Sequence, residues 1–264
     1  MNAPDSLTLD QPPPAFQAAL KVLHRLAQRD EEDVPGRLLQ ITAETLDVAR
    51  ASLWALTPGR RSIRCRGMFE RGMGMSEPDI ELACDAAPAY FQAIEGLLVL
   101  AAEDAQHDPR TVELAAGYLQ PLGIGAMLDV PICEFGEIVG VLCLEHLGPP
   151  RRWSSAERLF VTSLSGILSK RHDRLRMAAA EDERKRQLLF DAATGLAGRS
   201  LFIDRLSHAV AELPPGHDLA VLALDLERLR SLAHRYGGNF ADSVMAEGAA
   251  RIGQLVPAAR CGRI

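Results

Sequence analysis

Hydrophobic residues recur along the first part of the chain with periods that change between helical and strand-like. Apolar stripes with three- or four-residue spacing over residues 16–26, and over 38–48 after Pro35, predict two amphipathic helices. Residues 51–56 and 62–69 are short apolar-rich runs on either side of a Pro-Gly turn, which predicts a pair of strands.

The alternation of helices and strands continues to residue 144. Residues 77–94 predict a helix interrupted at a proline, 97–101 a short buried strand, and 108–119 another helix. Two runs rich in Val, Ile and Leu, 125–133 and 137–144, predict strands joined by a tight turn. Helices alternating with antiparallel strands predict an α+β domain with one mainly antiparallel sheet. Residues 1–14, which end in three prolines, predict a tail ahead of that domain.

A long helix is predicted over 157–190, where the chain has no proline and where Ser154 or Ser155 offers a cap. Its second half is almost continuously charged. One seam combines apolar and polar residues at four–three spacing: Leu164, Leu168, Leu175, Ala178 and Leu189, with Arg171, Asp182 and Lys185 between them. Two interpretations are open, a solvated connecting helix and a parallel dimer stalk whose polar seam positions tune its stability.

A second unit begins at residue 191. Its pattern predicts a helix over 199–213, a buried strand over 219–224 that ends at Asp225, and helices over 229–235 and 242–255. A strand followed by a helix is typical of an α/β unit. Residues 191–264 are few for such a unit to close its sheet and core, so we expect an incomplete domain.

Composition and charge narrow the classes of protein. The 264 residues carry a net charge of −6, which argues against a nucleic-acid-binding surface. No apolar run approaches the ~18–20 residues of a spanning helix, and the N-terminus shows no secretory pattern, so we expect a cytoplasmic protein with no membrane partner. The five cysteines lack metal-ligand spacing and predict reduced thiols.

The first part of the chain resembles a GAF domain over about residues 18–172. The resemblance rests on an ordered set of features: two leading helices, Glu103-Asp104 and Asp108-Pro109, the runs 123–132 and 136–144, and Arg151 to Ser154 ahead of a closing helix. It implies a GAF-like sensory domain over 15–172, an antiparallel sheet flanked by helices, whose closing helix overlaps the connecting helix at 157–190.

Residues 191–264 resemble the first half of a GGDEF (diguanylate cyclase) domain. Asp191 to Arg199 is similar to the family's opening D-x-L-T-G-L-x-N-R, with Ala193 for Leu and Gly198 for Asn. Asp225 to His234 is similar to its D-x-D-x-F-K-x-I-N-D segment. Arg263 and Ile264 then fall where the family has the two residues before its G-G-D-E-F signature. The resemblance therefore implies a partial, degenerate α/β domain.

The GGDEF resemblance implies specific roles for two acids. Asp225 corresponds to a metal ligand and Asp242 to a guanine contact, whereas Ala233 stands where the family has the asparagine that reads guanine. The other acidic ligand belongs to the signature, so Mg²⁺ and GTP are implied only for a complete output domain. A helix N-cap role for Asp225 or Asp242 stays open.

The GAF resemblance implies pocket candidates on elements that line the pocket in such domains. These are Cys65, Arg66, Tyr90, Asp104, His107 and Met127, each of which has an ordinary core or surface interpretation as well. No Cys-His pair for bilin attachment and no N-K-F-D-E pattern for cyclic nucleotides is present, so the ligand stays unknown. A rival activity, free-methionine-sulfoxide reduction by Cys84 and Cys133, has no persuasive cysteine spacing.

The expected function is that of a cytoplasmic signalling homodimer. A GAF sensory domain, with a small-molecule ligand as one option, is coupled to a GGDEF-type output domain of cyclic di-GMP signalling that is catalytically incompetent in this chain. Two alternatives are an active diguanylate cyclase, if the native chain continues past Ile264, and a GAF dimerisation module without a ligand.

Overall fold

The computed structural model describes residues 12–29, 33–227, 229–257 and 260–264. The predicted tail over 1–14 therefore lies mostly outside the described residues. The chain divides into two compact units, one ending at Leu175 and one beginning at Arg176.

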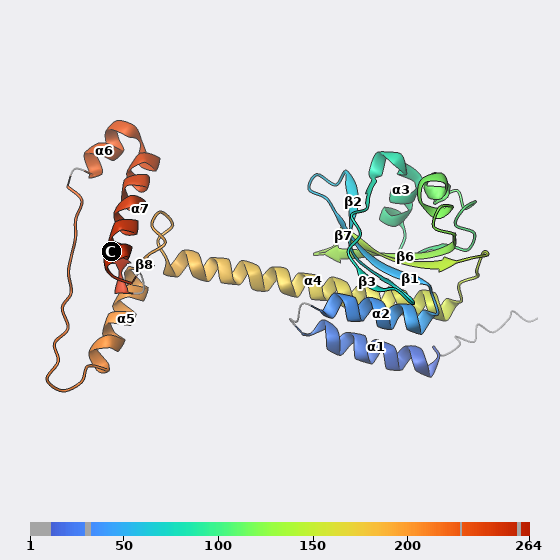
Figure 1. Cartoon of the computed structure of the whole chain (residues 1–264), viewed down its shortest axis with the longest axis horizontal. Coiled ribbons are helices and arrows are strands. Elements are labelled where there is room, and N and C mark those ends of the chain that lie inside the picture. The colour runs from blue at the N-terminus through green and yellow to red at the C-terminus, as the bar shows by residue number, and fades with distance from the viewer. Residues whose placement is uncertain (1–11, 30–32, 228, 258–259) are drawn as a thin grey trace, which may run out of the picture. The chain divides into compact units, whose positions relative to one another are not determined.

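The first unit is built on one antiparallel sheet (Figure 1). The strand order is β3-β2-β1-β7-β6-β5, and β4 pairs with β2 outside this path. The strands are β1 Arg50–Leu56, β2 Ser62–Glu70, β3 Gly74–Ser76, β4 Glu81–Ala83, β5 Leu100–Ala102, β6 Ile124–Glu134 and β7 Glu137–Leu147. The predicted α+β domain with a mainly antiparallel sheet is confirmed.

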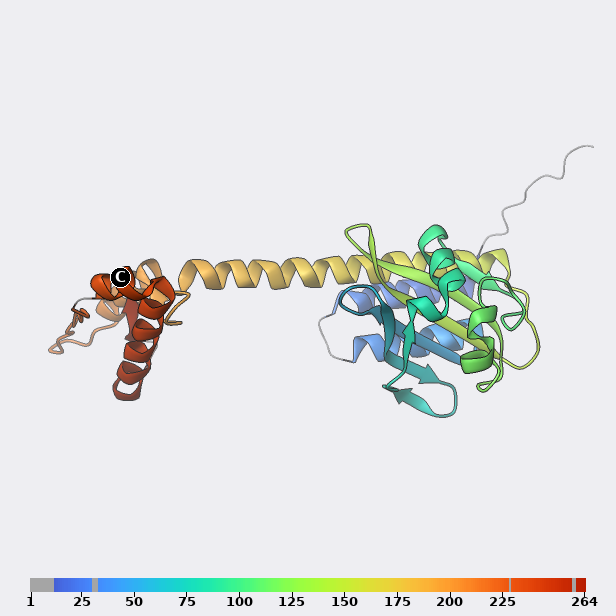
Figure 2. The same cartoon turned by 90° about the horizontal axis from the view of Figure 1, so that it is seen from above.

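Three helices cover one face of this sheet (Figures 1 and 2). They are α1 Pro14–Ala27, α2 Val34–Leu46 and the first part of α4 Ser155–Leu189. Their apolar stripes bury Leu23, Leu39 and Leu164 against Leu128 and Leu142 of the sheet. The amphipathic pattern of the sequence therefore identified this core correctly.

Shorter elements cover the opposite face of the sheet, where α3 lies in Figure 1. They are a 3₁₀ turn at Cys84–Ala86, α3 Pro88–Gly96, a 3₁₀ turn at Val112–Leu114 and a π-helix at Ala115–Leu119. Tyr90 and Tyr118 from these elements pack with Trp54 and Met127 of the sheet into a second core cluster.

Two helix predictions on this face are wrong in part. Residues 77–94 do not form one helix, because 81–83 pair with β2 and Glu81 forms an ion pair with Arg64 at 2.6 Å. Residues 108–119 form a 3₁₀ turn and a π-helix instead of a regular helix. Pairing and packing across the chain override local helix propensity at both places.

The long helix predicted over 157–190 is present as α4. Ser154 and Glu157 form a capping box before its first turn: the Glu157 N–H donates to Ser154 Oγ at 3.2 Å, and the Ser154 N–H donates to Glu157 Oε2 at 2.7 Å. Arg151 donates to the Leu46 carbonyl and to Glu157, at 2.8 and 2.5 Å. The end of α2 and the start of α4 are thereby held together.

The predicted seam along α4 is wrong in its first half. Leu164 and Leu168 are buried in the core of their own domain, with 1% and 8% of their surface exposed. Arg171 donates to the Ala27 carbonyl near the end of α1 at 3.1 Å. These positions are therefore occupied within one chain, and Leu175, 38% exposed, is the first exposed leucine of the seam.

The second unit contains α5 Arg199–Ala211, α6 Leu229–Tyr236 and α7 Gly238–Leu255, with β8 Ala197–Gly198 parallel to β9 Gly262–Arg263. The predicted buried strand at 219–224 is wrong. These residues are extended without a paired strand, and Leu222 and Leu224 are 87% and 76% exposed. A strand needs a neighbour for its backbone groups, and none of the described residues pairs with this segment.

Candidate functional site

The structure distributes the six GAF pocket candidates over three places. Cys65, Tyr90 and Met127 are buried in the core cluster beneath α3. Asp104 and His107 lie in a surface depression. Arg66 is exposed, because the register of β1 and β2 shifts there and leaves it without a partner between Cys65 and Gly67.

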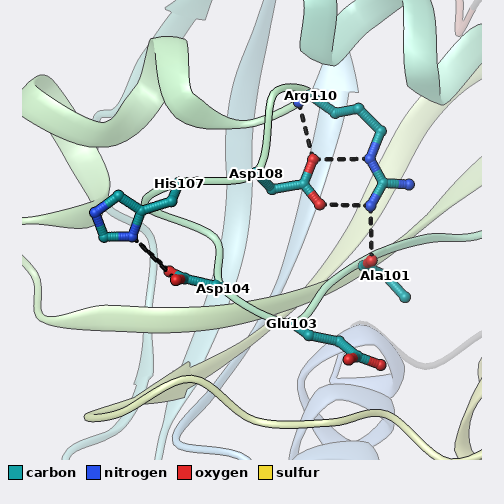
Figure 3. A pocket seen from close by; sticks show the side chains of 6 residues that line it. All are labelled: Ala101, Glu103, Asp104, His107, Asp108 and Arg110. Carbon is teal, nitrogen blue, oxygen red and sulfur yellow. Dashed lines mark hydrogen bonds and ion pairs between the residues drawn. The ribbon is translucent and has the colours of Figure 1, made fainter.

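The surface depression lies in the loop after β5 and has a volume of about 320 Å³ (Figure 3). Its charged side chains bond to one another and to the loop. Arg110 makes a two-pronged contact with Asp108, at 2.8 and 2.6 Å, and also donates to the Ala101 carbonyl at 2.9 Å. His107 Nδ1 lies 2.9 Å from Asp104. The remaining lining residues are Ala101 and Glu103.

These contacts set the charge of the depression. Hydrogen bonding to Arg110 holds the pKa of Asp108 below its usual range, so this carboxylate stays ionised. The Arg110 guanidinium is already satisfied by Asp108 and the backbone. The charged groups of the depression therefore act mainly to hold the loop in place.

A buried polar network lies on the α3 side of the sheet. The Tyr90 hydroxyl donates to Asp129 Oδ2 at 2.8 Å, and the Tyr118 hydroxyl donates to Glu145 Oε1 at 2.6 Å. Asp129 and Glu145 are completely buried. Arg50 Nη1 approaches Glu145 Oε2 to 3.8 Å and hydrogen-bonds Glu70 with Nη2 at 3.2 Å.

Burial dominates the acid–base chemistry of this network. It raises the pKa of Asp129 to about 7, with Glu145 adding to the rise and hydrogen bonds from Tyr90 and Cys143 opposing it. Burial also raises the pKa of Glu145, against the hydrogen bond from Tyr118 and the charge of Arg50. The pKa values of Tyr90 and Tyr118 are raised as well, so both hydroxyls keep their protons and donate.

Sequence reasoning found Tyr90 but missed Asp129, Glu145 and Tyr118 as parts of one cluster. A signal was present, since Asp129 interrupts an apolar run over 126–132 and Glu145 ends one over 141–144. An acid is seldom fully buried unless it has a partner, so an acid within an apolar strand points to a buried, paired group. The pairing of β6 with β7 then brings the two acids together.

The two candidate site residues of the GGDEF-like region, Asp225 and Asp242, are both exposed. Asp225 is exposed in the extended segment, and Asp242 is exposed within α7. Neither is an N-cap, because α6 begins at Leu229 and the N-cap of α7 is Gly237. Among the residues that the structure describes, no three His, Cys, Asp or Glu side chains converge on a metal position. The metal role of Asp225 therefore rests on the family resemblance alone, and we derive no step through a metal.

The opening motif of the second unit is well ordered. Asp191 Oδ1 accepts hydrogen bonds from the backbone N–H and hydroxyl of Thr194, at 3.0 and 2.8 Å. Gly195 adopts a φ of 68°, a value that favours glycine. Arg263 donates to Asp191 at 2.9 Å and ties the β9 segment to this turn.

The two cysteines of the rival reductase interpretation lie on different elements. Cys84 is in the 3₁₀ turn before α3, and Cys133 is near the end of β6. Burial raises the pKa of both thiols, which lowers their thiolate content and their nucleophilicity. All five cysteines are free thiols in the structure.

The comparisons with known proteins agree with the geometry. The family model described as "GAF domain" matches residues 30–171, just over half of the chain, and "Diguanylate cyclase, GGDEF domain" matches residues 188–261. The chain belongs to the GAF family. The GAF domain followed by a GGDEF domain makes it a cyclic di-GMP signalling protein with a sensory domain, and the predicted resemblance to both families is confirmed.

Solved structures support the GAF fold. The phycocyanobilin-bound GAF domain of a cyanobacterial phytochrome is 17% identical, with a TM-score of 0.52, over 62% of this chain and 96% of that one. A GAF domain of a phosphoenolpyruvate-protein phosphotransferase from Coxiella burnetii is also 17% identical, with a TM-score of 0.50, over 63% and 97%. At these identities the likeness shows the fold alone.

No curated protein matches the chain. Within the described residues, none of the helices combines the length and the apolar character that crossing a membrane requires.

Proposed function

We propose that the chain is a signalling protein in which the GAF domain senses a condition and the GGDEF-type region responds without making cyclic di-GMP. The observation that carries the sensory part is the order of the two domains, joined by the single helix α4. That helix begins inside the GAF core and continues into the second unit, so a single uninterrupted helix connects the two.

The residues of the second unit support a non-catalytic output. Ala233 has no amide to pair with a guanine edge, and loss of such a contact removes ~1–3 kcal/mol of discrimination, by analogy with base readout. Asp225 is exposed, and no three His, Cys, Asp or Glu side chains among the described residues gather into a metal site. Mg²⁺ needs near-octahedral oxygen coordination, which a single exposed carboxylate does not supply.

Nucleotide binding tests this proposal. Equilibrium dialysis of the chain against GTP with Mg²⁺ should give the same weak retention as the Asp225→Ala variant and as dialysis against ATP. Guanine-selective binding that the Asp225→Ala variant loses would show a working nucleotide site and would contradict the proposal.

We also propose that the protein is a parallel homodimer held through the second half of α4. Leu175 and Leu189 are each 38% exposed and share a four–three spacing with Ala178. The polar seam residues Asp182 and Lys185 fall on the same line and would tune the pairing.

A second candidate function is a GAF dimerisation module without a small-molecule ligand. The packing beneath α3 favours it, because Tyr90, Met127 and Leu119 are at most 2% exposed on the face where a ligand would enter. Under this alternative the GAF domain transmits no change of state to the second unit.

A further inference from the structure

Asp129 and Glu145 lie side by side on one face of the sheet. In the pairing of β6 with β7, Asp129 is opposite Cys143, and Met127 is opposite Glu145. Asp129 and Glu145 are therefore diagonal neighbours whose side chains point to the same face. Both are 0% exposed, beneath the tyrosines of α3 and the π-helix.

Each of these carboxyl groups has one oxygen that is satisfied and one that is not. Tyr90 donates to Asp129 Oδ2, and Tyr118 donates to Glu145 Oε1. Asp129 Oδ1 and Glu145 Oε2 have no hydrogen-bond partner among the described residues. A buried acceptor that lacks a partner is costly, and a buried carboxylate that lacks one is more costly still.

The positive charge near the pair is too little for two carboxylates. Arg50 is 3.8 Å from Glu145 and is also paired with Glu70, at 3.0 Å. Within the described part of the chain no ion pair reaches Asp129. Two ionised acids at this depth would leave a net buried negative charge, which proteins avoid by taking up a proton.

We propose that the Asp129–Glu145 pair is a proton-binding site through which the GAF domain responds to pH. The pair holds one proton, written as COOH/COO⁻ in equilibrium with two carboxylates and a proton released to solvent. Loss of the proton places a second negative charge beneath Tyr90 and Tyr118. The packing of α3 and of the π-helix against the sheet then weakens, because a carboxylate at this depth draws in water.

The groups around the pair come from every element packed against it. Besides the two acids they are Tyr90 of α3, Tyr118 of the π-helix, Cys143 of β7, Arg50 of β1, and Cys65 and Glu70 of β2. The tyrosines and cysteines keep their protons, because their pKa values are raised. Arg50 stays charged, because its pKa is raised too. Asp129 is therefore the group that changes state near neutral pH, and its titration is coupled to that of Glu145, whose pKa is also raised.

The direction of the pH effect follows from the raised pKa. Asp129 has a pKa of about 7 in the folded state against an ordinary value of 3.8, so the folded chain binds the proton more tightly than the unfolded chain. Its contribution to stability is complete below about pH 4 and is lost as pH rises to about 7. Within that window one proton changes the unfolding equilibrium constant by up to about tenfold per pH unit.

The acid pair is linked to the start of α4 by a short stretch of chain. Glu145 is near the end of β7, and residues 148–154 connect this strand to the capping box at the start of α4. Regulation of the output by this site rests on the proposed sensory function. Proton binding itself does not, and the experiments below measure it without any assay of the output.

Infrared spectroscopy of the full chain tests the binding step. Below about pH 6, the spectrum should contain the C=O stretch of a protonated carboxyl group that the Asp129→Asn or Glu145→Gln variant loses and that the exposed-site control Asp204→Asn keeps. The band should disappear on raising the pH past about 8. A spectrum without any such band lost in either variant would overturn the proposal.

A second measurement needs no variant that might fail to fold. Carbon NMR of the wild-type chain labelled at aspartate carboxyls should show one aspartate that titrates near neutral pH, well above the others. Titration of every aspartate below about pH 5 would assign no proton to Asp129 and would overturn the proposal as stated.

Hydrogen exchange then tests the response. Above about pH 7, the backbone N–H groups of 89–96 and 115–119 should exchange faster in the wild-type chain than in Asp129→Asn at the same pH, and below about pH 5 the two chains should agree. Comparison at equal pH removes the intrinsic pH dependence of exchange. Equal protection in both chains at every pH would overturn the sensing step, even where the infrared band is present.

Discussion

At the residue scale, Gly140 in the sheet and Gly166 in α4 differ in the space that surrounds them. A Cβ on Gly140 would lie 2.2 Å from the carbonyl oxygen of Trp54, on the neighbouring strand β1. A Cβ on Gly166, in α4, would meet nothing within 4 Å. The first glycine is required by the sheet, whereas the second is only a weak point in a helix.

The Gly140→Ala variant should lose about 2–4 kcal/mol of the free energy of unfolding, because the strands must separate to admit a methyl group. The matched control Gly166→Ala should gain up to about 1 kcal/mol. Urea unfolding followed by tryptophan fluorescence measures both, since the two tryptophans, Trp54 and Trp153, belong to the first unit. Equal stability of the two variants would contradict the close approach of β7 to β1.

At the element scale, the start of α4 depends on local hydrogen bonds that the sequence indicated. Ser154 was one of two predicted caps, and the structure selects it through its reciprocal bonds with Glu157. Ser154→Ala should therefore cost about 1 kcal/mol in the same fluorescence assay. Ser163→Ala, on the same helix, should change stability by less than about 0.5 kcal/mol, because its hydroxyl only bonds back to the Leu159 carbonyl. An equal loss of unfolding free energy in Ser163→Ala and Ser154→Ala would contradict a capping role for Ser154.

Elements that depend on their own periodicity could be predicted from the sequence. Helices α1, α2 and α4 and strands β6 and β7 have strong apolar patterns, and the structure places them close to the predicted bounds. The segment at 77–94 could not be predicted, because β4 forms only through its pairing with β2. The segment at 219–224 has the composition of a buried strand, but no described strand pairs with it.

The candidate site was predictable only in part for the same reason. Tyr90, Cys65 and Met127 were identified from the elements that carry them, and they do share one core cluster. The pairing of Asp129 with Glu145 depends on the register of β6 against β7, which neither strand specifies alone. Arg66 was expected in the pocket, but the bulge in β2 leaves it exposed.

At the scale of the whole molecule, the proposed dimer is testable through α4. The chain mass is 28.7 kDa, and light scattering at micromolar concentration should give twice that value. Leu189→Asp places like charges opposite each other in the seam and should yield monomers. The control Met177→Asp lies off the seam and, with 63% of its surface exposed, should stay dimeric. A monomeric wild-type chain would contradict the dimer.

The central claim is that this chain signals without synthesising cyclic di-GMP, and a turnover assay tests it most directly. Purified chain is incubated with GTP and Mg²⁺, and the products are separated by chromatography beside Asp225→Ala. The account predicts no cyclic di-GMP above the level of the variant, because Ala233 has no side-chain amide to pair with a guanine edge and a misplaced substrate reacts far more slowly. Product from the wild-type chain that the Asp225→Ala variant fails to make would contradict the account and establish an active cyclase.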